Sequence, residues 1–311
     1  MILLLSMLVV GGVMLYLGAE GLVWGGMRLA LRLRVAPLVI GLTVVAFGTS
    51  LPEFTVSLYA VMQEAEGIAV GNVVGSNIAN VSLILATSAI VFPVVVDFRA
   101  VRADLLILIG LTVVFIALCL DGELSRLDGA LLTAGIIAYL WRLAKSPTIA
   151  PDVSAAKPTQ SVPRMLLAVV AGLATLALGT HLFIGAAVEL ARMFGLSELV
   201  IGATIVAVGT SLPELATSMV AALHKQTEIV LGNILGSNVF NMIAVLGIIP
   251  LFKPIPVPAQ AITFHMPVML GLTVVLLPLL RFGGGIRRSA GWALLAVYVA
   301  FIVGTLVVDQ G

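Results

Sequence analysis

The sequence predicts an all-α polytopic membrane protein, with ten transmembrane helices in two inverted five-helix repeats and broken helices in the core. Three observations support this prediction. Of the 311 residues, 61% are hydrophobic and only 10% are charged, whereas soluble domains carry about 25% charged residues. Apolar runs of membrane-spanning length recur from end to end, and a long motif of the first half recurs in the second. This composition excludes a nucleic-acid binder, a soluble enzyme and a disulfide-stapled secreted domain.

The ten spans follow from charge clusters and from stretches rich in proline and glycine. A transmembrane helix needs about 20 apolar residues, and runs of this length are too uniformly apolar for barrel strands. The predicted spans are 2–27, 37–62, 68–92, 101–120, 127–143, 164–191, 198–222, 228–251, 262–280 and 288–308.

The basic residues predict the orientation of these spans. Loops that follow odd-numbered spans hold thirteen of the 16 lysines and arginines, and loops that follow even-numbered spans hold three. Basic loops face the cytoplasm. Both termini are therefore expected outside, and residues 145–163, rich in proline, serine and threonine, are expected to form a flexible cytoplasmic linker. The short linker favours the inner membrane of a prokaryote.

The linker divides the chain into two five-span repeats, 1–144 and 164–311. Their motif regions, 37–92 and 198–251, contain Gly41–Asn80 and Gly202–Asn241, which align without a gap at an offset of 161 residues and share 19 of 40 residues. A duplication explains this identity. Because each half has an odd number of spans, the second enters the membrane from the opposite side, which is typical of secondary transporters with a midplane site between the repeats.

Glu53 and Glu214 are the most informative residues. Each lies in the hexapeptide GTSLPE near the middle of an apolar span. A carboxylate at that depth is costly unless compensated, and it indicates a functional site. A glutamate that only bonds a neighbouring helix is the alternative, but two symmetry-related glutamates in identical hexapeptides favour function.

The neighbouring residues fit ion coordination. Pro52 and Pro213 lack an N–H group, so the carbonyls of Gly48 and Gly209 lose their helical partners, and local unwinding could free further carbonyls. Unpaired carbonyls at this depth need a cation or water, although a plain kink or back-bonded hydroxyls would also fit each residue alone. The oxygen donors beside the glutamates are the carbonyls of Ala46 and Ala207 and the hydroxyls of Thr49, Thr210, Ser50 and Ser211.

The second motif, GN-x-x-GSN-x-x-N, adds further oxygens. It places a hydroxyl and an amide one helical turn apart in each repeat, as Ser76 with Asn80 and Ser237 with Asn241. Its paired glycines (Gly71, Gly75, Gly232 and Gly236) predict close helix packing. Its other asparagines (Asn72, Asn77, Asn233 and Asn238) are expected to hold the broken backbone in place.

All of these candidate ligands are oxygen atoms. Ca²⁺ takes six to eight hard oxygens in flexible geometry, two glutamates neutralise one divalent ion, and the same oxygens suit Na⁺. Mg²⁺ resists dehydration, and soft transition metals would need a Cys/His cluster. One shared, charge-limited site predicts exchange, in which two kinds of cation compete and alternate.

With GTSLPE and GN-x-x-GSN-x-x-N in both halves of ten predicted spans, the chain resembles the sodium/calcium exchanger family of the calcium/cation antiporters. The resemblance implies an outside N-terminus, Ca²⁺ extrusion driven by Na⁺ entry, and ion ligands at Ala46, Thr49, Ser50, Glu53, Ser76, Asn80, Ala207, Thr210, Ser211, Glu214, Ser237 and Asn241. One departure is Asn241, where the potassium-dependent branch has Asp; dependence on potassium is therefore not expected. Protons are the alternative driving ion.

Other functions fit less well. A cation channel would explain the buried oxygens but not inverted repeats with one glutamate each. An enzyme would need a catalytic motif that is absent, and a carrier of organic solutes would need arginines or aromatic rings at the site. No cofactor, nucleic acid or obligate protein partner is predicted; the partners are Na⁺, Ca²⁺ and lipid. Glu20 could line an ion path or pair with an arginine, and His224 is expected at the interface.

Overall fold

The computed structural model describes residues 1–145, 160–195 and 207–308, and helices form most of this part of the chain. Nine of its helices are long and apolar enough to cross a membrane. A tenth predicted span, 198–222, is described only from Ala207 onward, and most of the predicted linker 145–163 lies outside the described residues. Within the described ranges, the predicted fold class is confirmed.

The first repeat contains these elements: α1 (Ile2–Leu33), α2 (Pro37–Ile40), the π-helix η1 (Gly41–Val45), α3 (Ala46–Thr49), α4 (Leu51–Met62), α5 (Glu66–Ala79), the π-helix η2 (Asn80–Leu85), α6 (Ala86–Val91), α7 (Phe98–Cys119), β1 (Glu123–Leu124) and α8 (Arg126–Ala144). The second repeat contains α9 (Val162–Met193), α11 (Ala207–Gly209), α12 (Leu212–Leu223), α13 (Thr227–Phe240), the π-helix η4 (Asn241–Val245), α14 (Leu246–Phe252), β2 (Ile255–Pro256), the π-helix η5 (Ala261–His265), α15 (Met266–Phe282) and α16 (Arg288–Val308).

The first helix is longer than predicted. It continues to Leu33 instead of ending near residue 27, and Arg34 then takes a left-handed conformation with φ of 58°. Arg28 was taken as the end of the span, but its guanidinium stacks 4.1 Å from the ring of Trp24 one turn earlier. Positive charges are favourable at the C-terminus of a helix, so basic residues prolong this helix beyond its apolar part.

Loops that were predicted to lie on the same side of the membrane contact each other in the structure. The strand β1 pairs with β2, joining the loops after the fourth and eighth spans. At the opposite ends of the helices, Val94 and Ile286 form a bridge between the loops after the third and ninth spans, and Thr227 donates a hydrogen bond of 2.7 Å to the carbonyl of Val95. These contacts agree with the predicted alternation of the loops.

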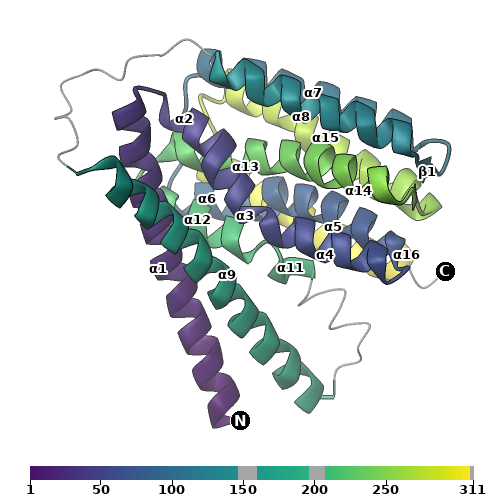
Figure 1. Ribbon diagram of the computed structural model, residues 1–311, viewed down its shortest axis with the longest axis horizontal. Helices are drawn as coiled ribbons and strands as arrows, with labels where there is room; N and C mark the ends of the chain where they lie inside the picture. Colours follow the sequence, from purple (N-terminus) through teal and green to yellow (C-terminus); the bar gives the residue numbers. More distant parts are fainter. Residues whose placement is uncertain (146–159, 196–206, 309–311) are drawn as a thin grey trace.

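Helices α1 and α9 run side by side and project away from the other helices (Figure 1). Glycines allow this close approach: a Cβ atom added at Gly18 would lie 2.8 Å from the carbonyl oxygen of Gly172, and one added at Gly172 would lie 2.7 Å from that of Gly18. The two backbones are therefore in direct contact, and α1 and α9 form a pair distinct from the core.

The core lies around α5 and α13. Every residue of α13 from Ile229 to Phe240 is buried, and this helix packs on η1 and α2, because a Cβ atom at Gly232 would lie 2.7 Å from the carbonyl oxygen of Leu38. The predicted small-residue face is thus confirmed in the second repeat. A Cβ atom added at Gly71 or Gly75 would meet no atom of the described residues within 4 Å, so close packing of the small-residue face in the first repeat stays a prediction.

Candidate ion-binding site

The two GTSLPE hexapeptides break their helices at the same residue. Ser50 separates α3 from α4 with φ −83° and ψ 3°, and Ser211 precedes α12 with φ −86° and ψ 8°. Pro52 and Pro213 each occupy the second position of the following helix. Since proline has no N–H group, the carbonyl four residues earlier has no donor in its own helix. The predicted interruption is therefore present in both repeats.

The breaks bring the two buried glutamates together with serines of the opposite repeat. Glu53 is 0% exposed and Glu214 is 1% exposed. The hydroxyl of Ser50 donates to Oε1 of Glu214 at 3.1 Å, and the hydroxyl of Ser211 donates to Oε1 of Glu53 at 3.1 Å. Ser76 also donates to Oε1 of Glu53, at 3.4 Å. Each carboxylate thus accepts a hydrogen bond from a serine of the opposite repeat.

Asn72 holds the broken segment from the neighbouring helix. Its Nδ2 donates to the carbonyl of Glu53 at 3.1 Å and to the hydroxyl of Ser57 at 3.0 Å, while its Oδ1 accepts from Thr210 at 3.2 Å. In the second repeat, Asn233 donates to the carbonyl of Glu214 at 3.4 Å and to Ser218 at 3.0 Å, and accepts from Thr49 at 3.1 Å. The predicted backbone role of these asparagines is confirmed.

A second pair of asparagines joins α5 to α13. Nδ2 of Asn77 donates to the carbonyl of Asn238 at 3.3 Å, and Nδ2 of Asn238 donates to the carbonyl of Asn77 at 3.4 Å. Their side-chain oxygens accept from the next turn: Asn80 donates to Oδ1 of Asn238 at 2.9 Å, and Asn241 donates to Oδ1 of Asn77 at 3.1 Å. The pairs are equivalent under the offset of 161 residues, so the site has approximate two-fold symmetry.

Asn80 and Asn241 also begin the π-helices η2 and η4. Short π-helical segments occur frequently at functional sites because the wider turn redirects side chains and loosens the regular hydrogen bonding. Both asparagines are fully buried or nearly so. The same irregularity therefore occurs at the same motif position in each repeat.

Four buried oxygens at this site have no hydrogen-bond partner among the described residues. They are Oε2 of Glu53, Oε2 of Glu214, Oδ1 of Asn80 and Oδ1 of Asn241. Buried polar atoms are nearly always hydrogen bonded, and an exception needs an explanation. These four form two symmetry-related pairs, and all are hard acceptors. Each is an oxygen of the kind that hard cations take as a ligand.

The other predicted ligands have mixed outcomes. Local unwinding could have freed the carbonyl of Ala46, but this carbonyl still accepts from the backbone N–H of Ser50 at 3.0 Å. The helix breaks only at Ser50 itself, so the hydrogen bond is kept. Ser237 of the opposite repeat donates to the same carbonyl at 3.5 Å. Ala207 begins α11, directly after residues that are not described, and its role stays a prediction.

The described residues contain no group of three or more histidine, cysteine, aspartate or glutamate side chains that could hold a metal ion. The paired-glutamate site instead combines two carboxylates with neutral amides and hydroxyls. This donor set matches alkali and alkaline-earth cations better than soft transition metals.

One polar contact outside the site was not predicted. The imidazole Nε2 of His224 lies 2.9 Å from Oε1 of Glu20, and the hydroxyl of Tyr16 donates to the same oxygen at 2.9 Å. Glu20 therefore pairs with a histidine and not with an arginine. It ties α1 to the end of α12.

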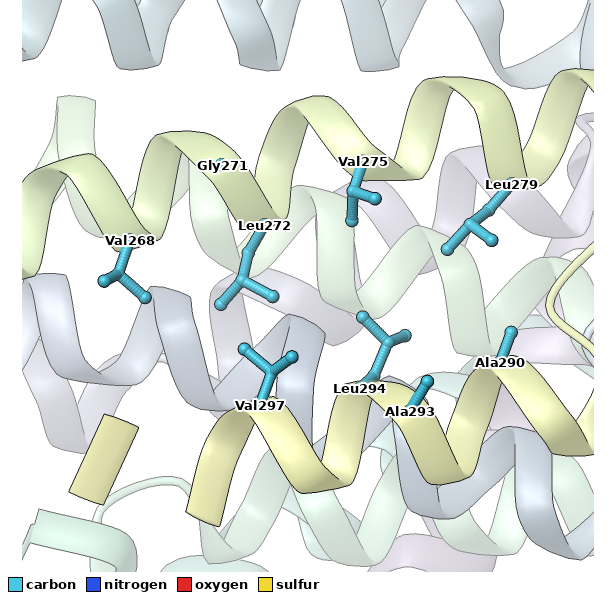
Figure 2. Close-up of a pocket in the computed structure, with 9 residues that line it drawn as sticks. All are labelled: Val268, Gly271, Leu272, Val275, Leu279, Ala290, Ala293, Leu294 and Val297. Carbon is cyan, nitrogen blue, oxygen red and sulfur yellow. The ribbon is translucent and has the colours of Figure 1, made fainter. Parts of the chain in front are cut away.

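A cavity of about 410 Å³ between α15 and α16 is not an ion site. Figure 2 shows its lining, which consists only of aliphatic side chains and Gly271, with Leu272 of α15 facing Val297 of α16. Among the described residues, no charged or oxygen-bearing side chain lines this space.

Comparison with known proteins gives consistent results. A family model described as "Sodium/calcium exchanger protein" matches residues 3–145 and 165–307. The chain is 35% identical to the putative antiporter CaxA of Alkalimonas amylolytica, covering 94% of this chain and 95% of that protein. It is 32% identical to the sodium/calcium exchanger MaX1 of Methanosarcina acetivorans, covering 95% and 96%. The solved structure of the sodium-calcium exchanger NCX_Mj superposes with a TM-score of 0.87 at 34% identity, covering 97% and 98%.

Proposed function

The chain belongs to the sodium/calcium exchanger family, and we propose on this premise that it exchanges Na⁺ for Ca²⁺ at the paired-glutamate site between its two repeats. The proposed ion ligands are the oxygens of Ala46, Thr49, Ser50, Glu53, Ser76, Asn80, Ala207, Thr210, Ser211, Glu214, Ser237 and Asn241. The four unpaired oxygens of Glu53, Glu214, Asn80 and Asn241 carry the proposal.

Electrostatics favours a cation at this position. Two carboxylates that are fully removed from water are costly unless a charge compensates them. One Ca²⁺ neutralises both, and its flexible coordination accepts carboxylate, amide and hydroxyl oxygens together. Na⁺ can use the same oxygens. The two ions therefore compete for one site, and binding of one favours release of the other.

Symmetry supports alternating access. The two repeats enter the membrane in opposite directions, so an exchange of their conformations would move the opening of the site from one side to the other. Three Na⁺ against one Ca²⁺ would carry one net charge per cycle, and the membrane potential would then contribute about 2.3 kcal/mol per 100 mV. Exchange that is insensitive to an imposed potential would contradict this stoichiometry.

The remaining features of the proposal follow from the sequence. The repeats are residues 1–144 and 164–311, joined by a cytoplasmic linker at 145–163, and both termini face outside. The protein is placed in the inner membrane of a prokaryote, and it acts as a transporter without enzymatic activity or a cofactor. Asn241 leaves the site with two carboxylates, which argues against dependence on potassium. Within residues 1–145, 160–195 and 207–308, no contact favours protons over Na⁺ as the driving ion.

Uptake of radiolabelled Ca²⁺ into proteoliposomes tests the proposal. Vesicles are loaded with Na⁺ or with acid and diluted into buffer without either. Uptake is expected only from Na⁺-loaded vesicles. It should be abolished by Glu53→Gln and by Glu214→Gln, since each removes one of the two compensating charges.

Glu189→Gln is the matched control. Glu189 is an exposed glutamate of α9 that pairs with Arg192 at 2.6 Å within its own helix. This variant should transport at the normal rate. Uptake driven by the pH gradient alone would establish the proton alternative, and normal uptake by both site variants would reject the paired-glutamate site.

A further inference from the structure

A second cavity lies at the basic side of the protein, between α7 and α15, which pack against each other. Its volume is about 480 Å³. Its apolar lining includes Leu106 of α7 and Leu277 and Pro278 of α15. Arg102 and Arg281 line the same cavity, each about one helical turn nearer to its helix end. The cavity therefore combines apolar side chains with two cationic side chains nearer the helix ends.

The two arginines are available to an external anion. Both are exposed, and neither pairs with a carboxylate among the described residues. The guanidinium of Arg281 lies 5.8 Å from the ring of Phe98 and 5.3 Å from the ring of Phe282. Stacking on aromatic rings orients a guanidinium while leaving its N–H donors free. The nearby acid Asp104 already pairs with Arg142 of α8.

The place of the cavity suggests the class of ligand. Arg102 and Arg281 lie at the helix ends joined by the bridge between Val94 and Ile286, on the side that the proposed orientation assigns to the cytoplasm. Anionic phospholipid headgroups lie at that depth and bind basic pockets between transmembrane helices. The leucines and the proline extend from this level towards the bilayer centre, where an acyl chain lies.

We propose that this groove binds an anionic phospholipid of the cytoplasmic leaflet. The phosphate lies between Arg102 and Arg281, which donate charge-assisted hydrogen bonds to its oxygens. One acyl chain lies along Leu106, Leu277 and Pro278. The apolar side chains select a lipid over a free phosphate ion, and the arginines select an anionic headgroup over a zwitterionic one.

This site is independent of the ion site, and it shares only the orientation with the proposed function. The cavity between α15 and α16 makes a useful contrast (Figure 2). It is also apolar, but no charged side chain lines it, so nothing there selects a headgroup.

The test measures lipid binding to the purified full chain by native mass spectrometry. The probes are phosphatidylglycerol and phosphatidylcholine with identical acyl chains, and inorganic phosphate in excess as a competitor. The wild-type protein should retain phosphatidylglycerol in preference to phosphatidylcholine, and phosphate should not displace it. The Arg102→Gln/Arg281→Gln double variant should lose about tenfold or more in affinity for phosphatidylglycerol, because charged hydrogen bonds contribute roughly 1.5–3 kcal/mol each.

Two further variants separate this site from general surface charge and from misfolding. Arg99→Gln/Arg287→Gln removes the same charge from the same side without touching the groove, and it should retain the lipid. Leu277→Trp keeps both arginines but fills the groove, and it should lose the lipid while eluting as a single symmetric peak. Equal losses in both arginine double variants, unchanged binding by Leu277→Trp, equal retention of both lipids, or displacement by phosphate would each overturn the proposal.

Discussion

Ser50 of the first repeat donates its hydroxyl hydrogen to Glu214 of the second, and Ser211 of the second donates to Glu53 of the first, both at 3.1 Å. The two bonds are related by the internal symmetry. Each carboxylate therefore depends on a donor that the other repeat supplies. It follows that neither half of the chain contains a complete site.

Replacing either serine should weaken ion binding to a similar extent. Hydrogen bonds to charged groups contribute roughly 1.5–3 kcal/mol, so Ser50→Ala and Ser211→Ala should each raise the Ca²⁺ concentration for half-maximal exchange by about tenfold or more. The measurement is the Ca²⁺ dependence of exchange in proteoliposomes. Ser6→Ala is the control, because the exposed hydroxyl of Ser6 donates to the carbonyl of Leu3 in its own helix. A large effect of one site serine without the other would show that the site is not symmetric.

Asp104 should matter for stability and not for ion affinity. It is 5% exposed on α7, pairs with Arg142 of α8 and accepts from Tyr139 at 3.4 Å. Removing one partner of a buried pair costs about 3–5 kcal/mol, and the partial exposure of Arg142 reduces this. Asp104→Leu should therefore lower the thermal unfolding midpoint in detergent.

The control for that experiment is Asp97→Asn, since asparagine caps a helix as well as aspartate does and Asp97 caps α7. The double variant Asp104→Leu/Arg142→Leu should recover part of the lost stability, because it leaves no unpaired charge. An unchanged midpoint for Asp104→Leu would mean that this ion pair does not stabilise the fold.

The contact of Glu20 with His224 should affect the transport rate only modestly. It joins α1 to the end of α12, and the side chains are 31% and 52% exposed. Even a fully charged pair at such exposure contributes only about 0.2–1 kcal/mol, so Glu20→Gln and His224→Gln should each change turnover by no more than about fivefold. The double variant should match the single ones, because both remove the same contact. Additive effects would show that the two residues act separately.

The glycine contact between α1 and α9 should tolerate no side chain. A Cβ atom at Gly18 would lie 2.8 Å from the carbonyl oxygen of Gly172, whereas one at Gly110 of α7 would meet no atom within 4 Å in the described part of the chain. Gly18→Ala should destabilise the protein by about 1–3 kcal/mol, and Gly110→Ala should not. Thermal unfolding checks both variants, and equal midpoints would refute the close contact.

Much of the candidate ion site was predictable, because the duplicated motif identifies the residues that lie together there. Glu53 and Glu214 are recognisable as charged residues in apolar spans, and the identical hexapeptides around them identify Ser50 and Ser211 as neighbours. The backbone role of Asn72 was predictable as well, since a broken helix needs donors. The sequence could not reveal that the serines cross to the opposite repeat, because that depends on how the two repeats pack.

The features that the sequence did not predict correctly are contacts between residues far apart in the chain and the positions at which helices end or break. Glu20 and His224 lie 204 residues apart, and neither residue has a local signal for the other. The end of α1 was placed too early because Arg28 was taken as leaving the membrane, whereas its stacking on Trp24 lets the helix continue. The carbonyl of Ala46 stayed in its helix because Ser50, and not an earlier residue, forms the break.

Helices α1 and α9 contain 32 residues each, and at a rise of 1.5 Å per residue each is about 48 Å long. The hydrocarbon core of a bilayer is only about 30 Å thick. This closely packed helix pair must therefore tilt in the membrane or extend beyond it. Its inclination relative to the other helices is visible in Figure 1. A thinner membrane favours a larger inclination. The length of the lipid acyl chains, which sets the membrane thickness, should therefore change the tilt of α1 and α9 without any ligand being bound.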